Sequence, residues 1–441
     1  MTTTATTRIK AAVAAAVAGI TATASSVQAQ STREAQLEFR IHQLEQRVRE
    51  LDEQLGAAPL HADVPDSRAA NQSVTPNALA GTRFSFSGFM KIDALRSDYD
   101  DGEAADGSIG RDFYVPGAIP VGGMAESADF DSHVKQSRFI FRTDTDTDSG
   151  KLSSLLEVDL YGSSLGDERA TNTYGLQLRH AYVQYGAWLF GQTWSNFQDV
   201  AALPESTDFI GPTDGTVFVR QPQLRYTAGS LAIALENPEI TLTPAGGGTR
   251  IASDDGNIPD LTLAYRYVLP HGYLRAAALA RQLRYQTTGA MGVGAINDTQ
   301  RTAALSLSGK IDFGVHDLRF MATAGEGIGR YVGVNFANDA ELTSQGQLRP
   351  IDGWAGFAAW RQVWTGKLRS TFMLSTSQYD NDIALSGPAA NKSSWSWAVN
   401  TFYTPYPKLD VGLEWRHAVR EIESGAEGSF DRLHAVAKYS F

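Results

Sequence analysis

Alternating apolar and polar residues mark the end of this chain. In residues 432–441 the odd positions are apolar and end with Tyr439 and Phe441, whereas most even positions are polar, as at Arg432 and His434. Successive residues of a β-strand point to opposite faces, so this pattern predicts one apolar and one polar face. A tilted strand of about 9–11 residues crosses a bilayer core. A two-sided strand of a soluble sheet has the same pattern, so the rest of the chain must distinguish the two.

The same alternation recurs from residue 82 onward. It is clear in four runs, at 83–95, 315–324, 367–377 and 408–420. A charged side chain costs roughly 2–4 kcal/mol at the lipid midplane, so the polar faces of membrane strands must point inward. The run 216–227 places Arg220 on the same face as Phe218 and Tyr226, so its inner face stays open.

Two kinds of connection separate these runs, and they alternate without a break. Short turns contain Gly, Pro, Asp or Tyr and lie at 148–150, 185–187, 228–229, 270–272, 312–314, 365–366 and 405–407. Long polar connections lie near 98–132, 163–173, 194–215, 237–258, 286–299, 327–351, 380–392 and 421–431. Short periplasmic turns opposite long outer loops are typical of outer-membrane barrels. The sequence therefore predicts an all-β fold, an antiparallel transmembrane β-barrel of about 16 strands over residues 81–441.

The N-terminal 80 residues predict three segments of another kind. Residues 1–29 resemble a secretory signal peptide, with Arg8 and Lys10 before a small apolar stretch and a small-residue cleavage site at 27–29. Residues 30–56 predict a periplasmic coiled-coil helix, and residues 57–80, rich in Ala, Pro, Asn and Ser, predict a flexible linker.

Within the predicted helix, apolar residues recur with heptad spacing. Ile41, Val48 and Leu55 fall at position a, and three leucines fall at position d. This choice favours two-stranded coils. The alternative is a single amphipathic helix that packs on its own domain. Either reading points to association rather than to chemistry.

Composition narrows the function further. The chain has 441 residues, no cysteine and a formal net charge of −11, which excludes disulfides and thiolate catalysis and argues against nucleic-acid binding. No later stretch holds 18 uninterrupted apolar residues, so a membrane-embedded form must be a closed barrel. The eight histidines are scattered, and His180 and His434 are expected in the lumen rather than on a metal. No cofactor or metal is predicted.

Three motifs resemble the DcaP-like family of trimeric outer-membrane porins. They are residues 88–94 (GFMKIDA), 191–197 (GQTWSNF) and 218–227 (FVRQPQLRYT). The order of signal peptide, short coil, linker and barrel is also similar to that family. The resemblance implies a homotrimer in the bacterial outer membrane, a helical extension in the periplasm, and a pore for small organic anions, dicarboxylates in particular. The dimer-favouring a and d positions depart from a trimeric coil.

A ring of 16 strands leaves an aqueous channel, so the function of the barrel should depend on the segment that narrows this channel. The connection 194–215 is the candidate constriction, because it is the third long loop and carries Asp199, Glu205 and Asp208. The alternative is a surface loop. The inward faces supply a basic set: Lys91, Arg138, Arg142, Arg225, Arg266, Arg275, Arg281, Arg319, Lys367, Arg369 and Arg416. Arginine binds carboxylates with a planar fork, so such a set could pass anions between weak sites.

An alternative interpretation is that these side chains only neutralise wall acids such as Glu157, Asp159, Asp317 and Glu414. For the whole protein we expect a passive, anion-preferring porin and no enzyme activity. The second hypothesis is a structural or adhesive barrel anchored by its periplasmic coil. An outer-membrane lipid hydrolase would need a Ser, a His and an acid converging on the wall, which sequence spacing does not reveal.

Overall fold

The computed structural model describes residues 81–162, 173–288 and 295–441. The predictions for the signal peptide, the coiled coil and the linker lie outside these residues. Residues Leu79–Phe441 belong to one compact unit. In the described part of the chain, no helix is both long enough and apolar enough to span a membrane.

The strands of this unit are, in chain order, β1 (Arg83–Tyr99), β2 (Asp129–His133), β3 (Arg138–Thr147), β4 (Gly150–Gly162), β5 (Gly175–Tyr185), β6 (Trp188–Trp194), β7 (Arg220–Ala228), β8 (Leu231–Glu236), β9 (Ile240–Thr243), β10 (Ile251–Ser253), β11 (Asp260–Leu269), β12 (Gly272–Thr287), β13 (Ile296–Phe313), β14 (His316–Glu326), β15 (Ala340–Leu342), β16 (Leu348–Pro350), β17 (Asp352–Val363), β18 (Leu368–Asp380), β19 (Asn391–Tyr406), β20 (Leu409–Ile422) and β21 (Glu427–Ser440). Short helices are α2 (Ile109–Asp112), α3 (Ile383–Ser386), η2 (Pro116–Ala118), η3 (Val200–Ala202), η4 (Thr213–Gly215) and η5 (Gly329–Tyr331).

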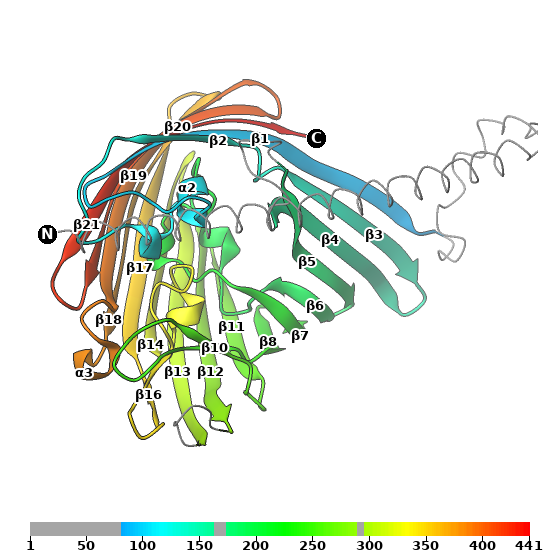
Figure 1. Ribbon diagram of the computed structural model, residues 1–441. Helices are drawn as coiled ribbons and strands as arrows, with labels where there is room; N and C mark the ends of the chain where they lie inside the picture. The colour runs from blue at the N-terminus through cyan, green and yellow to red at the C-terminus, as the bar shows by residue number, and fades with distance from the viewer. Residues whose placement is uncertain (1–80, 163–172, 289–294) are drawn as a thin grey trace, which may run out of the picture. The chain divides into compact units, whose positions relative to one another are not determined.

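Each long strand pairs antiparallel with its neighbours in sequence, and β1 closes the ring by pairing with β21 (Figure 1). The sheet holds 17 strands, but β2 and β3 both pair with β1 and together form one wall position. The result is a closed antiparallel barrel of 16 wall positions, which confirms the predicted fold class. All seven predicted short turns connect adjacent strands at one end.

The interruption between β2 and β3 has a local cause. At residues 134–137 the ladder to β1 is broken, and the hydroxyl of Ser137 accepts a hydrogen bond from the backbone N–H of Lys91 at 3.1 Å. The same hydroxyl lies 3.3 Å from the Lys91 carbonyl oxygen, to which it donates. One side chain thus replaces both backbone partners that the break removes, which satisfies otherwise unpaired buried groups.

The predicted faces match the burial along the strands. In β18, Leu374 is 65% exposed, whereas its inward neighbours Met373 and Ser375 are 3% and 6% exposed. Large exposed aromatics gather near the short turns: Trp188, Tyr226, Tyr267, Phe313, Tyr403 and Tyr439. Aromatic residues at this height are typical of the interfacial girdle of a membrane barrel. In β7 the inner face, which the sequence left open, carries Gln221, Gln223 and Arg225.

Gly272 offers a test of the turn geometry. It opens β12 with φ +133°, and a Cβ there would collide with the Lys310 carbonyl oxygen of β13. We expect Gly272→Ala to destabilise the barrel by about 1–3 kcal/mol, because both strain and a clash oppose the side chain. The control is Gly366→Ala in another short turn, where a Cβ meets nothing within 4 Å. Thermal unfolding in detergent measures both; equal midpoints would contradict the expectation.

Candidate constriction

The third loop, residues 195–219 between β6 and β7, lies against the inner wall of the barrel. Its successive residues contact successive strands. Asn196 forms hydrogen bonds with residues of β8, β11 and β12, and Asp199 forms one with a residue of β13. The Leu203 carbonyl accepts a hydrogen bond from β14, and Glu205 accepts from β18. Thr207 forms hydrogen bonds with residues of β20 and β1. A surface loop would make none of these contacts with inward side chains, so the loop narrows the lumen.

A two-point contact joins Glu205 to Arg369 of β18. Arg369 Nε lies 2.7 Å from Glu205 Oε2, and its Nη2 lies 2.6 Å from Oε1. The same Nη2 lies 3.0 Å from Asp410 Oδ1, and Nη1 donates to the Thr404 hydroxyl at 2.7 Å. Two-point arginine–carboxylate contacts fix orientation as well as position. This pair therefore holds the middle of the third loop on the wall.

Glu414 of β20 and Lys91 of β1 hold the following residues. Glu414 Oε2 accepts from the Ser206 hydroxyl at 2.6 Å and from the Thr207 N–H at 3.2 Å. Its other oxygen accepts from Arg416 at 2.8 Å. Lys91 Nζ pairs with Asp93 at 2.8 Å and donates to the Thr207 carbonyl. The loop is thus held by charged groups that neutralise one another.

The loop then turns back at Asp208. The Asp208 carboxylate accepts from its own loop at the N–H groups of Ile210 and Gly211, at 3.2 and 3.3 Å. It also accepts from the Tyr114 N–H of the first loop (residues 100–128) at 2.8 Å. Asp199 similarly accepts the Ser308 hydroxyl at 2.7 Å. Asp199 also accepts from the Ala201 N–H at 3.2 Å. Of the three predicted loop acids, only Glu205 forms an ion pair with an arginine in the described structure.

The return segment of the third loop is bonded to the first loop and to β19. Tyr114 donates its hydroxyl to Asp214 at 2.6 Å, and Ser396 of β19 donates to the other oxygen. Asp214 is fully buried, and burial raises the pKa of its carboxyl above the usual value. Burial and the neighbouring Asp214 likewise raise the pKa of Tyr114 well above its usual value.

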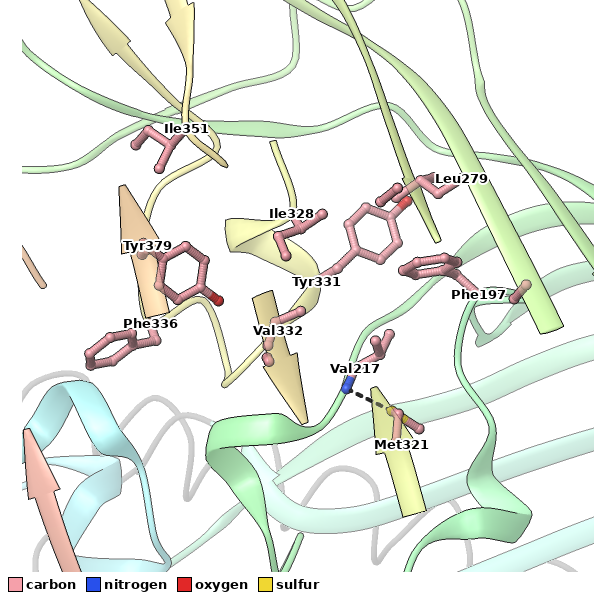
Figure 2. Packing of buried hydrophobic residues seen from close by; sticks show 14 of the residues in the cluster. Phe197, Val217, Leu279, Met321, Ile328, Tyr331, Val332, Phe336, Ile351 and Tyr379 are labelled. Carbon is pink, nitrogen blue, oxygen red and sulfur yellow. Dashed lines mark hydrogen bonds between the residues drawn. The ribbon is translucent and has the colours of Figure 1, made fainter. Parts of the chain in front are cut away.

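An apolar cluster joins the third loop to the sixth loop, residues 327–351. Figure 2 shows Val217 and Phe197 of the third loop close to Ile328, Tyr331 and Val332. Two backbone bonds join the segments: the Phe218 N–H to the Tyr331 carbonyl at 2.8 Å, and the Gly333 N–H to the Thr216 carbonyl at 3.1 Å. Burial of such side chains stabilises the inward position of both loops.

The predicted basic residues fall into four groups. Arg138, Arg142, Arg319, Arg369, Arg416 and Lys91 face inward and each pairs with a carboxylate. Arg281 is enclosed between Asp260 and Asp339, with no exposed side-chain surface. Lys367 lies in the short turn before β18 and donates to the Pro405 carbonyl. Arg225, Arg266 and Arg275, hereafter the arginine triad, form no ion pair within the described residues.

The triad shares one height on the wall. Each of the three arginines lies three positions from the strand end at a short turn. Arg225 and Arg266 lie three positions before the ends of β7 and β11, and Arg275 lies three positions after the start of β12. Arg266 and Arg275 are direct cross-strand partners. Arg225 and Arg275 donate to the carbonyls of Trp194 and Asn196, where the third loop begins. Arg266 stacks over the ring of Tyr273 at 3.6 Å.

The sequence analysis missed Arg179. It sits at a β-bulge of β5, where the register to β4 shifts after the pair Glu157–His180. Arg179 is 2.7 Å from both Glu157 and Asp159 and lies over the ring of Phe209 from the third loop. Alternation assigns odd and even positions to opposite faces of a strand, and a bulge exchanges the two faces beyond it. The inward position of Arg179 can therefore be recognised only from the strand pairing, not from the sequence pattern.

Arg220 lies in the run 216–227, whose inner face the sequence left open. It lines a pocket of about 340 Å³ together with Phe113, Tyr161, Phe209 and Phe218. Its guanidinium lies over Trp194, and its buried Nη1 has no hydrogen-bond partner in the parts of the chain described.

Residues 20–441 match the family model of the DcaP outer membrane protein. This chain belongs to the DcaP family. The crystal structure of the outer membrane channel DcaP of Acinetobacter baumannii has a TM-score of 0.67 at 22% identity, over 82% of this chain and 99% of that chain. An anion-selective porin from Comamonas acidovorans gives a TM-score of 0.48 at 9% identity, over 82% and 100% of the two chains. No curated protein matches this sequence.

Membership in the DcaP family confirms the resemblance that the three motifs indicated. The chain is an outer-membrane β-barrel of the porin type. The Acinetobacter DcaP structure supports the same fold at an identity too low to carry residue roles across.

A double-mutant cycle tests how the third loop is held. We expect Arg369→Gln and Glu205→Gln to couple by about 1.5–3 kcal/mol in unfolding free energy, because a charged hydrogen bond is lost in each single variant. The control cycle uses Arg349 and Asp382, a 2.7 Å pair that is more than one-third exposed at both ends. That pair should couple by about 0–1 kcal/mol. Equal coupling in the two cycles would show that the Glu205 contact does not hold the loop.

Asp214 gives a pH test. Because its pKa is raised in the folded state, its contribution to stability is complete below the unfolded pKa and is lost as pH rises through the folded pKa. We therefore expect Asp214→Asn to be more stable than the parent chain at pH 8 and to lose that advantage at pH 4. Thermal unfolding at the two pH values measures this. An advantage that is the same at both pH values would contradict the assignment.

Proposed function

We propose that this DcaP-family protein is a porin for passive, anion-preferring diffusion of small organic acids, with short dicarboxylates as the cargo class. The observation that carries the proposal is the arginine triad. Its three guanidinium groups face the lumen at one height and lack carboxylate partners in the described structure. Arginine stays charged at every working pH, so the triad supplies a permanent positive field.

Charge balance distinguishes the triad from the other wall arginines. Arg369 faces two carboxylates, Glu205 and Asp410, so this group carries no net positive charge. Arg416 is matched by Glu414. These two pairs support, for Arg369 and Arg416, the alternative interpretation that wall arginines neutralise wall acids. An anion passing the third loop is attracted mainly by charges that have no internal partner, and a field inside a low-dielectric wall is focused on the lumen.

Two acids lie near the triad, and each has other hydrogen-bond partners. Asp199 of the third loop lies near Arg275 and accepts from the Ala201 N–H at 3.2 Å and from the Ser308 hydroxyl at 2.7 Å. Glu236 of β8 accepts from the Asn196 N–H at 2.8 Å and from the Thr262 hydroxyl at 2.7 Å. It also accepts from Gln221. Arg225 and Arg275 instead donate to carbonyl oxygens, which carry no full negative charge, and Arg266 stacks on the ring of Tyr273. A weak site of this kind can attract an anion and still release it.

We further propose a homotrimer, with outer-membrane lipid around it and the N-terminal helix in the periplasm. A concave outer surface of about 520 Å³ on β1 and β3–β6 supports the assembly. Phe86, Phe141 and Phe190 surround the small residues Ser154 and Ala181 there. Small residues allow close approach of a second copy of the chain, whereas bulky aliphatic side chains such as Leu305 and Leu374 cover other strands.

Neutralising the triad tests the function. In planar bilayers with a potassium chloride gradient, we expect the parent chain to prefer anions. The variant Arg225→Gln/Arg266→Gln/Arg275→Gln should lower the anion-to-cation permeability ratio about fivefold. One unit charge 4 Å from a passing ion contributes about 1 kcal/mol even in bulk water.

The matched control removes three cations elsewhere, as Arg83→Gln/Arg349→Gln/Lys367→Gln. Arg83 and Arg349 are more than half exposed, and Lys367 lies in a turn. Charges beyond a Debye length of about 10 Å at 0.1 M salt are screened, so selectivity should change little. If both variants lowered the anion-to-cation permeability ratio equally, the triad would not be the source of the anion preference. A barrel that conducts no ions would favour the structural or adhesive alternative.

A further inference from the structure

A second polar pocket lies among the loops at the end of the barrel opposite the short turns. It has a volume of about 280 Å³ and is enclosed by the fourth loop (237–259), the sixth loop, the seventh loop (381–390) and the adjoining ends of β19 and β20. The polar residues of its lining that the argument uses are Arg250, Asn338, Asn381, Ser386, Asn391 and Arg420. This lining contains two arginines and no carboxylate.

A small sheet fixes the walls of this pocket. The fourth loop supplies β9 and β10, the sixth loop supplies β15 and β16, and β9 pairs parallel with β15. In Figure 1, β10, β16 and α3 lie at the same end of the barrel. The Gly246 N–H donates to the Leu385 carbonyl at 2.7 Å, which joins the fourth loop to the seventh. The pocket is therefore built from three loops that hold one another.

Both arginines are oriented by their neighbours. Arg250 donates through Nε to the Asn338 side chain and through Nη2 to the Asn335 carbonyl at 2.7 Å. Arg420 donates through Nε to Asn391 at 2.8 Å and through Nη1 to the Ile119 carbonyl at 2.6 Å. Arg250 Nη1 and Arg420 Nη2 make no hydrogen bond within residues 81–162, 173–288 and 295–441. Each guanidinium thus keeps one nitrogen for a ligand.

The neighbouring acids are occupied. Glu341 accepts from Ser386 and from the Asp382 N–H at 2.9 Å, and burial raises the pKa of its carboxyl. Glu423 accepts from the Asn381 amide at 2.7 Å. Asp339, whose charge acts on Arg250, pairs with Arg281 at 2.9 Å. None of these three acids forms an ion pair with Arg250 or Arg420 in the described structure. Two oriented, unpaired arginines in one pocket form a site for negative charge.

We propose that this pocket is an outer capture site for short dicarboxylates, in which Arg250 and Arg420 each bind one carboxylate before the solute reaches the third loop. The proposal rests on the anion-uptake function proposed above. The pocket lies just below the volume range of drug-sized ligand sites, so its ligand has a short carbon chain. Capture at the mouth raises the local concentration of anion above the constriction.

The test compares succinate uptake into proteoliposomes over a range of concentrations. Arg250→Gln should raise the half-saturating succinate concentration at least threefold and leave the reversal potential in potassium chloride unchanged. Arg420→Gln should do the same. Because Arg420 also holds the first loop, Arg250→Gln carries the test if Arg420→Gln lowers the unfolding midpoint. The control is Arg349→Gln, in the same loops but outside the pocket lining, which should leave both quantities unchanged.

Two results would overturn the capture site. One is an unchanged half-saturating succinate concentration in Arg250→Gln while the triad variant still loses anion preference; the porin function would then stand without the pocket. The other is an equal effect of Arg250→Gln on acetate uptake, because a site that bridges two carboxylates should not retain a monocarboxylate. A parent chain that shows no anion preference would overturn the function itself, whatever the pocket variants do.

Discussion

Closure of the sheet is the constraint on which the rest of this structure depends. In hydrocarbon an unpaired backbone N–H or C=O costs several kcal/mol, so a sheet that spans the membrane cannot leave an edge. Here β1 pairs with β21 from Phe89–Ser440 to Tyr99–Phe430, and the Phe441 N–H reaches the Gly88 carbonyl at 3.0 Å. Once the ring is closed, every second residue faces lipid and the others face an enclosed interior. The inward polar side chains of each strand are then solvated only by water inside the lumen.

That interior explains why so many arginines are paired. A wall that carries both signs of charge in a confined space neutralises itself, as Arg369 with Glu205 and Arg416 with Glu414 illustrate. The pairs hold the third loop, and the same pairing removes their charge from the passing solute. Uncompensated positive charge is therefore left at positions where the wall offers carbonyls in place of carboxylates, as it does beside Arg225 and Arg275, and the proposed anion preference rests on these positions.

The interior also contains a hydrophobic core, which a water-filled cylinder does not need. Phe197, Val217 and Tyr331 belong to a buried cluster formed by the third and sixth loops and the inner wall. Burial of these side chains stabilises inward loops in a way that ion pairs alone do not, because each ion pair must offset its own desolvation. The constriction is thus a packed structure supported by the barrel rather than a loop hanging in it.

The sequence by itself determined the barrel. Alternation with a period of two, seven short turns and the faces of strands such as β18 follow from local residue patterns, and so does the inward position of most arginines. It also pointed to the third loop, through its length and order in the chain, as one that lies inside the barrel. These features depend on neighbours in sequence, which a single chain displays directly.

Only the tertiary structure decided which arginines remain unpaired. Arg369 and Glu205 are 164 positions apart, Asp199 meets Ser308, and Tyr114 meets Asp214, and no local pattern encodes such pairs. The sequence patterns also did not predict the break between β2 and β3, the bulge at Arg179 or the inward position of the first and sixth loops. The physical reason is that charge compensation acts through space, and the distances that govern it exist only after the ring of strands has closed.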